Sequence, residues 1–339
     1  MEKLTLLGID IAKNVFQLHG VNDSGKTVLR KKLSRTKLVE FIANLPPCVI
    51  VMEACGGANY WHRKFKAMGH EVKIISPQFV KPFVKTNKND PNDAEAIVEA
   101  ASRPSMRYVS PKSVAQEDIQ SIHRVRSRLV SERTALVNQI RGLLAEYGIV
   151  VPQGISKIRQ ALPEILEDAE NELSHTGRQL FSDLHGEIGE KDKRIKAYNA
   201  RIEEIFKSNE SCQKISKIEG IGPIVATAIV ATIGDPNVFK NGRHFSAFLG
   251  LVPGQSSSGG KQRLLSISKR GDTYIRTLLI HGGRSVVRYI GSKEDRRSKW
   301  IRDLKERRGA NRAAVAVANK NARIIWALLA KDEKYRKVV

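Results

Sequence analysis

The sequence LTLLGIDIAKNVFQLHGVNDSGKTVLRKKL, residues 4–33, predicts the fold of the first third of the chain. It contains three strand-like runs, 4–10, 15–21 and 27–33, and the second of them alternates apolar and polar residues. The turn sequence NDSG, residues 22–25, separates the last two runs. Links this short cannot hold a crossover helix, so we predict three antiparallel neighbouring strands.

Helix and strand patterns alternate over the residues that follow. A helical pattern over 37–44 precedes the solid apolar run CVIVM, residues 48–52, which is typical of a buried parallel strand. A second helical pattern covers 58–68, and a fifth strand is predicted over 72–76. A three-stranded meander followed by helix, strand, helix and strand predicts a ribonuclease-H-like, resolvase-like α/β domain.

Long amphipathic helices follow this α/β part. Apolar residues recur at three- and four-residue steps across 114–147 and again across 184–206, while charged residues fill the other positions. The segment 153–182 between them is less regular. Two long helices of this kind predict a coiled-coil or dimerisation arm, and their heptads are too few to define an oligomeric state.

The last part of the chain predicts a mainly α domain. It begins with IEGIGP, residues 218–223, which resembles a helix-hairpin-helix turn. The backbone N–H groups of Gly220 and Gly222 in such a turn can bind a phosphate. Further helices are predicted over 225–233, 272–289 and 310–330.

We therefore expect an α/β plus α protein in three parts. A ribonuclease-H-like domain with a trailing long helix is predicted over 1–148. Coiled-coil or dimerisation helices are predicted over 149–207, and the C-terminal domain over 208–339. A chain of 339 residues is long enough for such a division.

The charge of the chain indicates the class of its partner. The sequence has 58 Lys and Arg against 35 Asp and Glu, a formal net charge of +23. A polyanion would neutralise this charge, so nucleic acid is the predicted partner and a membrane surface is the alternative. No run approaches the ~18 apolar residues that span a bilayer. The N-terminus lacks a signal-peptide pattern and the three cysteines lack CxxC spacing, so we expect a cytoplasmic protein without membrane contact, disulfides or zinc.

Four acids in the first third of the chain are candidates for a metal site. Asp10 and Glu53 end two apolar runs, and Asp90 and Asp93 open a helical pattern three residues apart. Carboxylates at the ends of neighbouring strands, facing a pair on a helix, can hold a divalent metal against a phosphate. This arrangement predicts phosphate chemistry on a nucleic acid.

Each of these acids also has a structural interpretation. Asp10 can be a turn residue, and Glu53 can form an ion pair with a lysine at a strand end. Asp90 and Asp93 can be the N-cap residue and the N3 acid of one helix, because Pro91 suits its first position. Residues three apart share a helix face, so capping and metal binding are compatible. The neighbouring acids that compete for the role are Glu95 and Glu99.

A second candidate site lies in the Ser/Gly-rich stretch 254–260, which contains three consecutive serines. Four basic residues follow closely: Lys261, Arg263, Lys269 and Arg270. A serine among such cations can attack a phosphodiester, since the cations bind the phosphate and stabilise developing charge. The alternatives are a flexible linker for the stretch and ordinary phosphate contacts for the cations.

These motifs together resemble the DEDD transposases of bacterial insertion sequences, a family of bridge-RNA-guided recombinases. The patterns GIDIAK, MEACGG and NDPNDAEAI are similar to the four-acid signature of that family. The resemblance implies metal ligation by Asp10, Glu53, Asp90 and Asp93. The C-terminal pattern over 218–282 looks like the family's transposase domain. Its ISKRGD and LLIHG motifs resemble those of one subgroup of the family.

The resemblance also implies a catalytic serine, which follows the Gly-Leu-x-Pro turn and precedes a glycine. Counting from GLVP, residues 250–253, places it at Ser258. Counting back from Ser268-Lys269 places it at Ser257. We favour Ser258, because Gly259 follows it, and keep Ser257 as the alternative.

The chemistry implied by the resemblance is attack of serine on DNA, a covalent protein–DNA link, strand exchange and resolution of a junction. The acids with Mg²⁺, or alternatively Mn²⁺, would assist at a composite site formed between subunits. The implied partners are double-stranded donor and target DNA, a structured non-coding guide RNA, and further copies of the chain in a dimer or tetramer. The implied location is the nucleoid of the bacterial cytoplasm.

Two other functions fit the residues. A metal-dependent DNA junction nuclease would use only the acids, with the C-terminal part as a DNA clamp. A non-catalytic nucleic-acid-binding protein would use the acids as caps and ion-pair partners. Substitution of the serines distinguishes the first of these from a recombinase, and substitution of the acids distinguishes the second.

Overall fold

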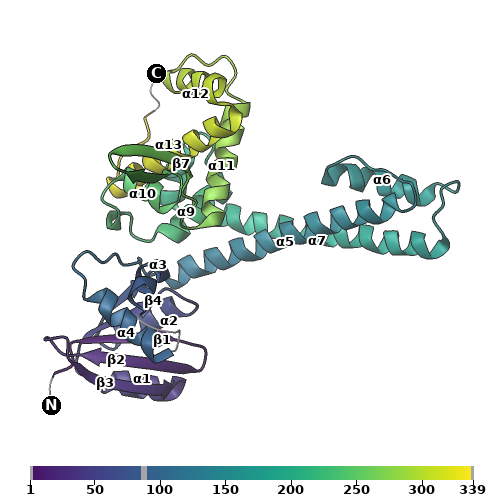
Figure 1. Cartoon of the computed structure of the whole chain (residues 1–339). Helices are drawn as coiled ribbons and strands as arrows, with labels where there is room; N and C mark the ends of the chain where they lie inside the picture. The colour runs from purple at the N-terminus through teal and green to yellow at the C-terminus, as the bar shows by residue number, and fades with distance from the viewer. Residues whose placement is uncertain (1–2, 85–89, 337–339) are drawn as a thin grey trace. The chain divides into compact units, whose positions relative to one another are not determined.

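A computed structural model describes residues 3–84 and 90–336, with the side chains of Asp90 and Pro91 outside the description (Figure 1). The chain forms two compact units, Met1–Ser113 and Val114–Val339. The long helix that the sequence analysis attached to residues 1–148 therefore belongs to the second unit. We describe each unit separately.

The N-terminal unit contains a five-stranded sheet in the order β3-β2-β1-β4-β5. The meander predicted from residues 4–33 is confirmed, because β1 (Leu6–Ile11), β2 (Val15–Val21) and β3 (Thr27–Ser34) pair antiparallel. The strands β4 (Val49–Glu53) and β5 (Glu71–Ile75) are parallel to β1. The arrangement is the predicted ribonuclease-H-like one.

Helices cover both faces of this sheet because its strands carry apolar side chains on both sides. One face packs against α1 (Arg35–Ala43) and α2 (Ala58–Ala67), with Trp61 fully buried between them and the strands. The other face packs against α4 (Asp90–Ala101). The short α3 (Pro77–Val80) and a 3₁₀ turn, Lys81–Phe83, connect β5 to the chain leading into α4.

Gly8 in β1 allows α4 to lie directly on the sheet. A Cβ atom at this position would lie 2.6 Å from Cγ2 of Val98 and 2.7 Å from the carbonyl oxygen of Ala94. Both distances are shorter than any real Cβ contact. Only glycine therefore permits this approach of helix to strand.

Two long helices begin the C-terminal unit. In Figure 1, α5 (Val114–Ala145) and α7 (His175–Ser208) run side by side, as their contacts require, and α6 (Ile155–Glu167) packs against both. The segment 153–182, whose pattern is less regular in the sequence, contains α6 and the first turns of α7. Pro163 lies inside α6, and a proline in the interior of a segment ordinarily argues against a helix. A coiled-coil or dimerisation role for α5 and α7 remains a prediction.

The remainder of the unit is mainly helical, as predicted. Its helices are α8 (Glu210–Ser216), α9 (Pro223–Ile233), α10 (Gly242–Phe248), α11 (Thr273–Arg288), α12 (Arg296–Arg308) and α13 (Ala310–Ala330). The core lies where α9, α11 and α13 meet. Within residues 3–84 and 90–336, no helix combines the length and the apolar character needed to cross a membrane.

The Ser/Gly stretch is an ordered hairpin and not a linker. The strands β6 (Pro253–Ser258) and β7 (Lys261–Ile267) pair antiparallel. Gly259 and Gly260 form the two-residue turn with φ of 55° and 77°. Positive φ at both central positions is the requirement of a tight hairpin turn whose twist matches the strands.

Candidate functional site

Asp10 and Glu53 lie at the ends of adjacent parallel strands. Ile9 in β1 is opposite Met52 in β4, so Asp10 and Glu53 occupy the next level of the same ladder. Side chains alternate between faces along a strand, and Ile9 and Met52 point into the core below α1 and α2. Asp10 and Glu53 therefore point together to the face that α4 covers, and both are half-buried.

The charges of both carboxylates act on the neighbouring thiol of Cys55. The pKa of the Cys55 thiol is raised to about 11, first by burial and then by the negative charges of Glu53 and Asp10. The Cys55 Sγ lies 3.8 Å from the carbonyl oxygen of Ile11. This thiol, two residues after Glu53, is a neighbour of the site that the sequence analysis did not include.

The helix α4 brings Asp93 to the same face of the sheet. Its contact with β1 at Gly8 involves Ala94, which directly follows Asp93, and Gly8 is two residues before Asp10 on the same side of the strand. Asp93 is half-buried. Asp90 begins the helix, and its side chain lies outside the described part of the structure.

Glu95 and Glu99, the neighbouring acids that could take the place of Asp93, have cationic partners. A carboxylate oxygen of Glu95 lies 3.0 Å from Nη2 of Arg30 and 4.0 Å from Nδ1 of His19, above the neighbouring strands. Glu99 pairs with Arg103 one turn further along its own helix. These ion pairs favour Asp93 over Glu95 and Glu99 as the acid that accompanies Asp10 and Glu53.

The acids fit a divalent metal in part. Among the described side chains, no group of three or more His, Cys, Asp or Glu residues is close enough to hold a metal ion. The carboxylates of Asp10 and Glu53 would supply two hard oxygen ligands. Mg²⁺ is often bound by only one or two carboxylates, with water and substrate phosphate completing its shell. The donor chemistry therefore suits Mg²⁺ or Mn²⁺, with α4 as the source of further ligands.

The hairpin separates the two candidate serines onto opposite faces. Ser258 is opposite Lys261, and Ser256 is opposite Arg263. Residues opposite each other point to the same side, and alternate residues share it, so Ser258 lies on the face that carries both cations. All of these residues are exposed.

Ser257 lies on the other face of the hairpin, among amide side chains. It is opposite Gln262, and its Oγ accepts a hydrogen bond of 2.8 Å from Nε2 of Gln255. Neither amide carries charge to stabilise an attacked phosphate. The register therefore distinguishes the two serines chemically, which counting along the sequence does not.

Lys269 and Arg270 lie at the base of the hairpin, where the backbone is tightly held. The N–H of Lys269 donates to the carbonyl of Gly250 at 3.2 Å, and Lys269 adopts φ of 55°. The carbonyl of Arg270 accepts a 2.9 Å hydrogen bond from the buried guanidinium of Arg276. Gly250 also has a positive φ, and no Cβ would fit there against Arg270. The serines thus project on a short arm with a rigid base.

The predicted phosphate-binding glycines differ from each other. Gly220, with φ of 87°, packs on α11, where a Cβ would lie 2.7 Å from the carbonyl oxygen of Gly282. Helix packing alone therefore requires this glycine. Gly222 is the exposed N-cap of α9, with open space around its Cβ position. Phosphate binding at this turn remains a prediction, and Gly222 is the better placed of the two.

Two family models match different parts of the chain. A DEDD transposase model of the IS110 type matches residues 7–149, and the model described as Transposase IS116/IS110/IS902 family matches residues 212–300. The first match contains the four acids and the second contains the hairpin.

Full-length similarity extends to curated transposases. The transposase for insertion sequence element IS1111A of Coxiella burnetii is 48% identical over 99% of this chain and 92% of its own. A probable family 20 transposase of Pseudomonas aeruginosa is 50% identical over 98% of this chain and 99% of its own. The transposase for insertion sequence element IS1328 of Yersinia enterocolitica is 40% identical over 99% of this chain and 100% of its own. The chain belongs to the IS110/IS116/IS902 family of insertion-sequence transposases.

Proposed function

We propose that this transposase recombines DNA with Ser258 as the nucleophile, assisted by the acids of the N-terminal unit. The Ser258 oxygen attacks a DNA phosphorus and forms a phosphoserine ester as the bond to the leaving deoxyribose oxygen breaks. That oxygen takes up the proton lost by serine. A hydroxyl of the partner strand then attacks the ester and regenerates Ser258. The number of phosphate ester bonds is conserved, so strand exchange requires no external energy source.

The cationic face of the hairpin supports Ser258 as the nucleophile. Lys261 is directly opposite it, and Arg263 is two residues further along β7 on the same side. Negative charge builds on the phosphate oxygens as serine attacks. Cations held in position for that charge stabilise the transition state more than the ground state. The register that places Ser258 with these cations is the observation that carries the proposal.

Asp10 and Glu53 would hold Mg²⁺ or Mn²⁺, with Asp93 and Asp90 on α4 as the further ligands. The metal supplies a Lewis acid that neutralises phosphate charge. The half-buried setting of Asp10 and Glu53 limits their hydration and strengthens their interaction with a cation. The pair of strand ends orients both carboxylates before any metal is present.

The proposed partners are double-stranded donor and target DNA and a structured non-coding guide RNA in the bacterial nucleoid. Base pairing with the RNA would supply sequence recognition, while the protein contacts backbone. The net charge of +23 and the low aromatic content of 6% support backbone recognition. We further propose a dimer or tetramer with α5 and α7 as the contact helices, since strand exchange needs two cleaved duplexes.

The test uses purified protein, Mg²⁺, and an end-labelled DNA carrying the element's terminal junction, with the adjacent non-coding RNA added. Covalent protein–DNA adduct is measured on denaturing gels, and the modified peptide is identified by mass spectrometry. Ser258→Ala is expected to abolish the adduct, and Ser257→Ala, its matched control on the opposite face, to retain it.

The reverse pattern would assign the nucleophile to Ser257. Cleavage without adduct in both variants, still dependent on Asp10, would replace the recombinase with a metal-dependent nuclease. Equal activity with and without the RNA would remove the proposed guidance.

A further inference from the structure

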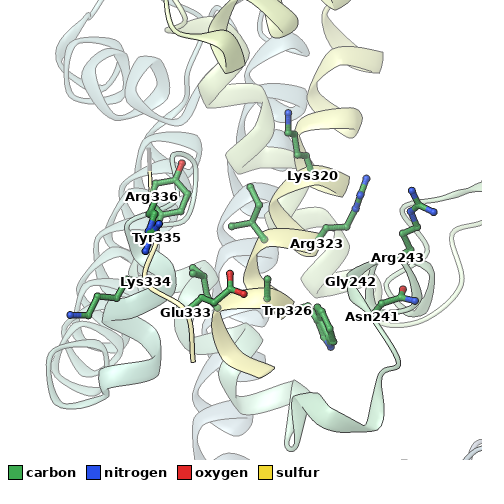
Figure 2. Close-up of a pocket in the computed structure, with 13 residues that line it drawn as sticks. Asn241, Gly242, Arg243, Lys320, Arg323, Trp326, Glu333, Lys334, Tyr335 and Arg336 are labelled. Atoms are coloured by element: carbon green, nitrogen blue, oxygen red, sulfur yellow. The ribbon is translucent and has the colours of Figure 1, made fainter. Parts of the chain in front are cut away.

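A cavity of about 1140 Å³ lies in the C-terminal unit, and the proposed chemistry uses none of its lining residues. Figure 2 shows Lys320, Arg323 and Trp326 along α13, with Arg243 from α10 on one side and the segment Glu333–Arg336 on the other. The volume exceeds the ~300–1,000 Å³ typical of sites for drug-sized molecules. The cavity therefore suits a ligand larger than a single small anion.

The lining of this cavity is strongly cationic. Five basic side chains and one acidic side chain, that of Glu333, face it. In residues 3–84 and 90–336, neither Arg243 nor Arg323 forms an ion pair with a carboxylate. Uncompensated cations that line a concave surface attract anionic ligands.

Lys320 is held at the cavity although its charge is disfavoured there. Its Nζ lies 4.3 Å from the centre of the Trp300 ring. Burial lowers the pKa of this amine, and repulsion from Arg297, Arg296 and Arg323 lowers it further. An anion bound among these groups would relieve the repulsion.

Two aromatic side chains in the cavity wall are fixed in place. The indole N–H of Trp326 donates a 3.0 Å hydrogen bond to the carbonyl of Pro236. Nη1 of Arg297 lies 3.4 Å from the Tyr335 hydroxyl, while Nη2 of the same guanidinium donates to Asn321 at 2.7 Å. Both rings line the cavity and also pack against the hydrophobic core, so their positions are fixed before a ligand binds.

We propose that this cavity binds a single-stranded nucleic-acid segment. Its phosphates would contact Arg243, Lys320 and Arg323, and a base would stack on Trp326 or Tyr335. Cations that follow a backbone, combined with aromatic platforms, are the chemistry of single-strand recognition. Duplex bases are already stacked on each other and cannot reach such rings. The inference is independent of the nucleophile and of the acids.

The first test measures binding of fluorescein-labelled 12-mers of uridine and of deoxythymidine, and of a 12-base-pair duplex, to the full-length protein by anisotropy. The variant R243A/R323A is compared with R307A/R308A, which removes the same charge from exposed positions on α12 outside the cavity lining. Each lost phosphate contact lowers the salt slope for a single strand by about 0.7, and two contacts lower it by about 1.4. If the variant and the wild type bind equally at 1 M salt, this change in slope makes the variant bind about 25-fold more weakly at 0.1 M salt.

We expect R243A/R323A to show this loss for a single strand and R307A/R308A to retain most of the affinity. Comparison of the two 12-mers identifies whether RNA or DNA is the natural ligand. Equal weakening by both variants would mean general surface charge and would overturn the proposal. A loss confined to the duplex would overturn it as well.

Two further variants test the ligand geometry. Glu333→Gln removes the one acid of the lining and is expected to tighten single-strand binding, whereas weaker binding would contradict the assignment. Bound bases should quench the fluorescence of Trp326, so the quenching seen with wild type should fall in Trp326→Phe. Undiminished quenching in that variant would exclude stacking on Trp326. Thermal unfolding of each variant verifies that the fold is retained.

Discussion

Replacement of Gly8 by alanine tests whether α4 lies on β1 as the structure shows. The added methyl would lie 2.6 Å from Cγ2 of Val98 and 2.7 Å from the Ala94 carbonyl oxygen. Overpacking of this kind costs ~1–3 kcal/mol. The helix would have to move away from the strand, so Asp93 would shift relative to Asp10.

Two additional variants make the prediction specific. Gly56→Ala is the matched control, because no atom lies within 4 Å of its Cβ position and its φ is not positive. A change below ~0.5 kcal/mol is expected for it. Val98→Ala alone should cost about 1.6 kcal/mol, at ~0.8 kcal/mol for each lost methyl. Gly8→Ala combined with Val98→Ala should show a favourable coupling of roughly 1 kcal/mol and an incomplete rescue, since the Ala94 carbonyl remains.

Hydrogen-exchange mass spectrometry of peptides from β1, β2 and α4 gives the free energy of opening of the N-terminal unit alone. A loss of ~1–3 kcal/mol accelerates exchange about 5- to 150-fold for amides that exchange through unfolding of the unit. Recombination should fall as well, because a misplacement of about 1 Å can cost ~100-fold in rate. Exchange in Gly8→Ala that equals exchange in Gly56→Ala would refute the packing of α4 on β1.

Three other predictions concern charge. His123, buried between Tyr274 and Thr227, has its pKa lowered to about 4 by burial and by Arg126, so the unfolded chain binds a proton at this residue more readily than the folded chain does. The free energy of unfolding, measured by urea titration, should therefore fall by roughly 3 kcal/mol as pH is lowered from ~6.5 toward 4, and His123→Gln should flatten that dependence. Asp10→Asn should reduce metal-dependent strand exchange at least ~100-fold, whereas Glu95→Gln should leave it nearly unchanged in the same assay; equal losses would contradict the assignment of the acids. Affinity for non-specific duplex DNA should fall as salt rises, with a log–log slope of about −0.9 per phosphate contacted. An affinity that does not depend on salt would disprove the prediction that basic residues bind the DNA phosphates.

The N-terminal sheet was predictable because its signals are local. Residues 15–21 alternate, residues 48–52 are continuously apolar, and the short links between the first runs exclude crossover helices. The structure confirms the three antiparallel strands and the two parallel ones. The helix α6 was not predicted, since it contains Pro163, ordinarily a helix breaker; packing against α5 and α7 stabilises it.

The sequence by itself determined the acids at the strand ends, the cationic character and the resemblance to transposases, since each depends on residue type and on spacing along the chain. Only the tertiary structure decided which side chains meet. Composition did not distinguish a linker from a hairpin over 254–260, because that choice depends on positive φ at Gly259 and Gly260 and on a clamped base. Counting favoured Ser258 and kept Ser257 as the alternative, whereas strand register separates the two serines onto opposite faces. Register and close packing arise from contacts between residues distant in sequence, and local pattern carries no information about them.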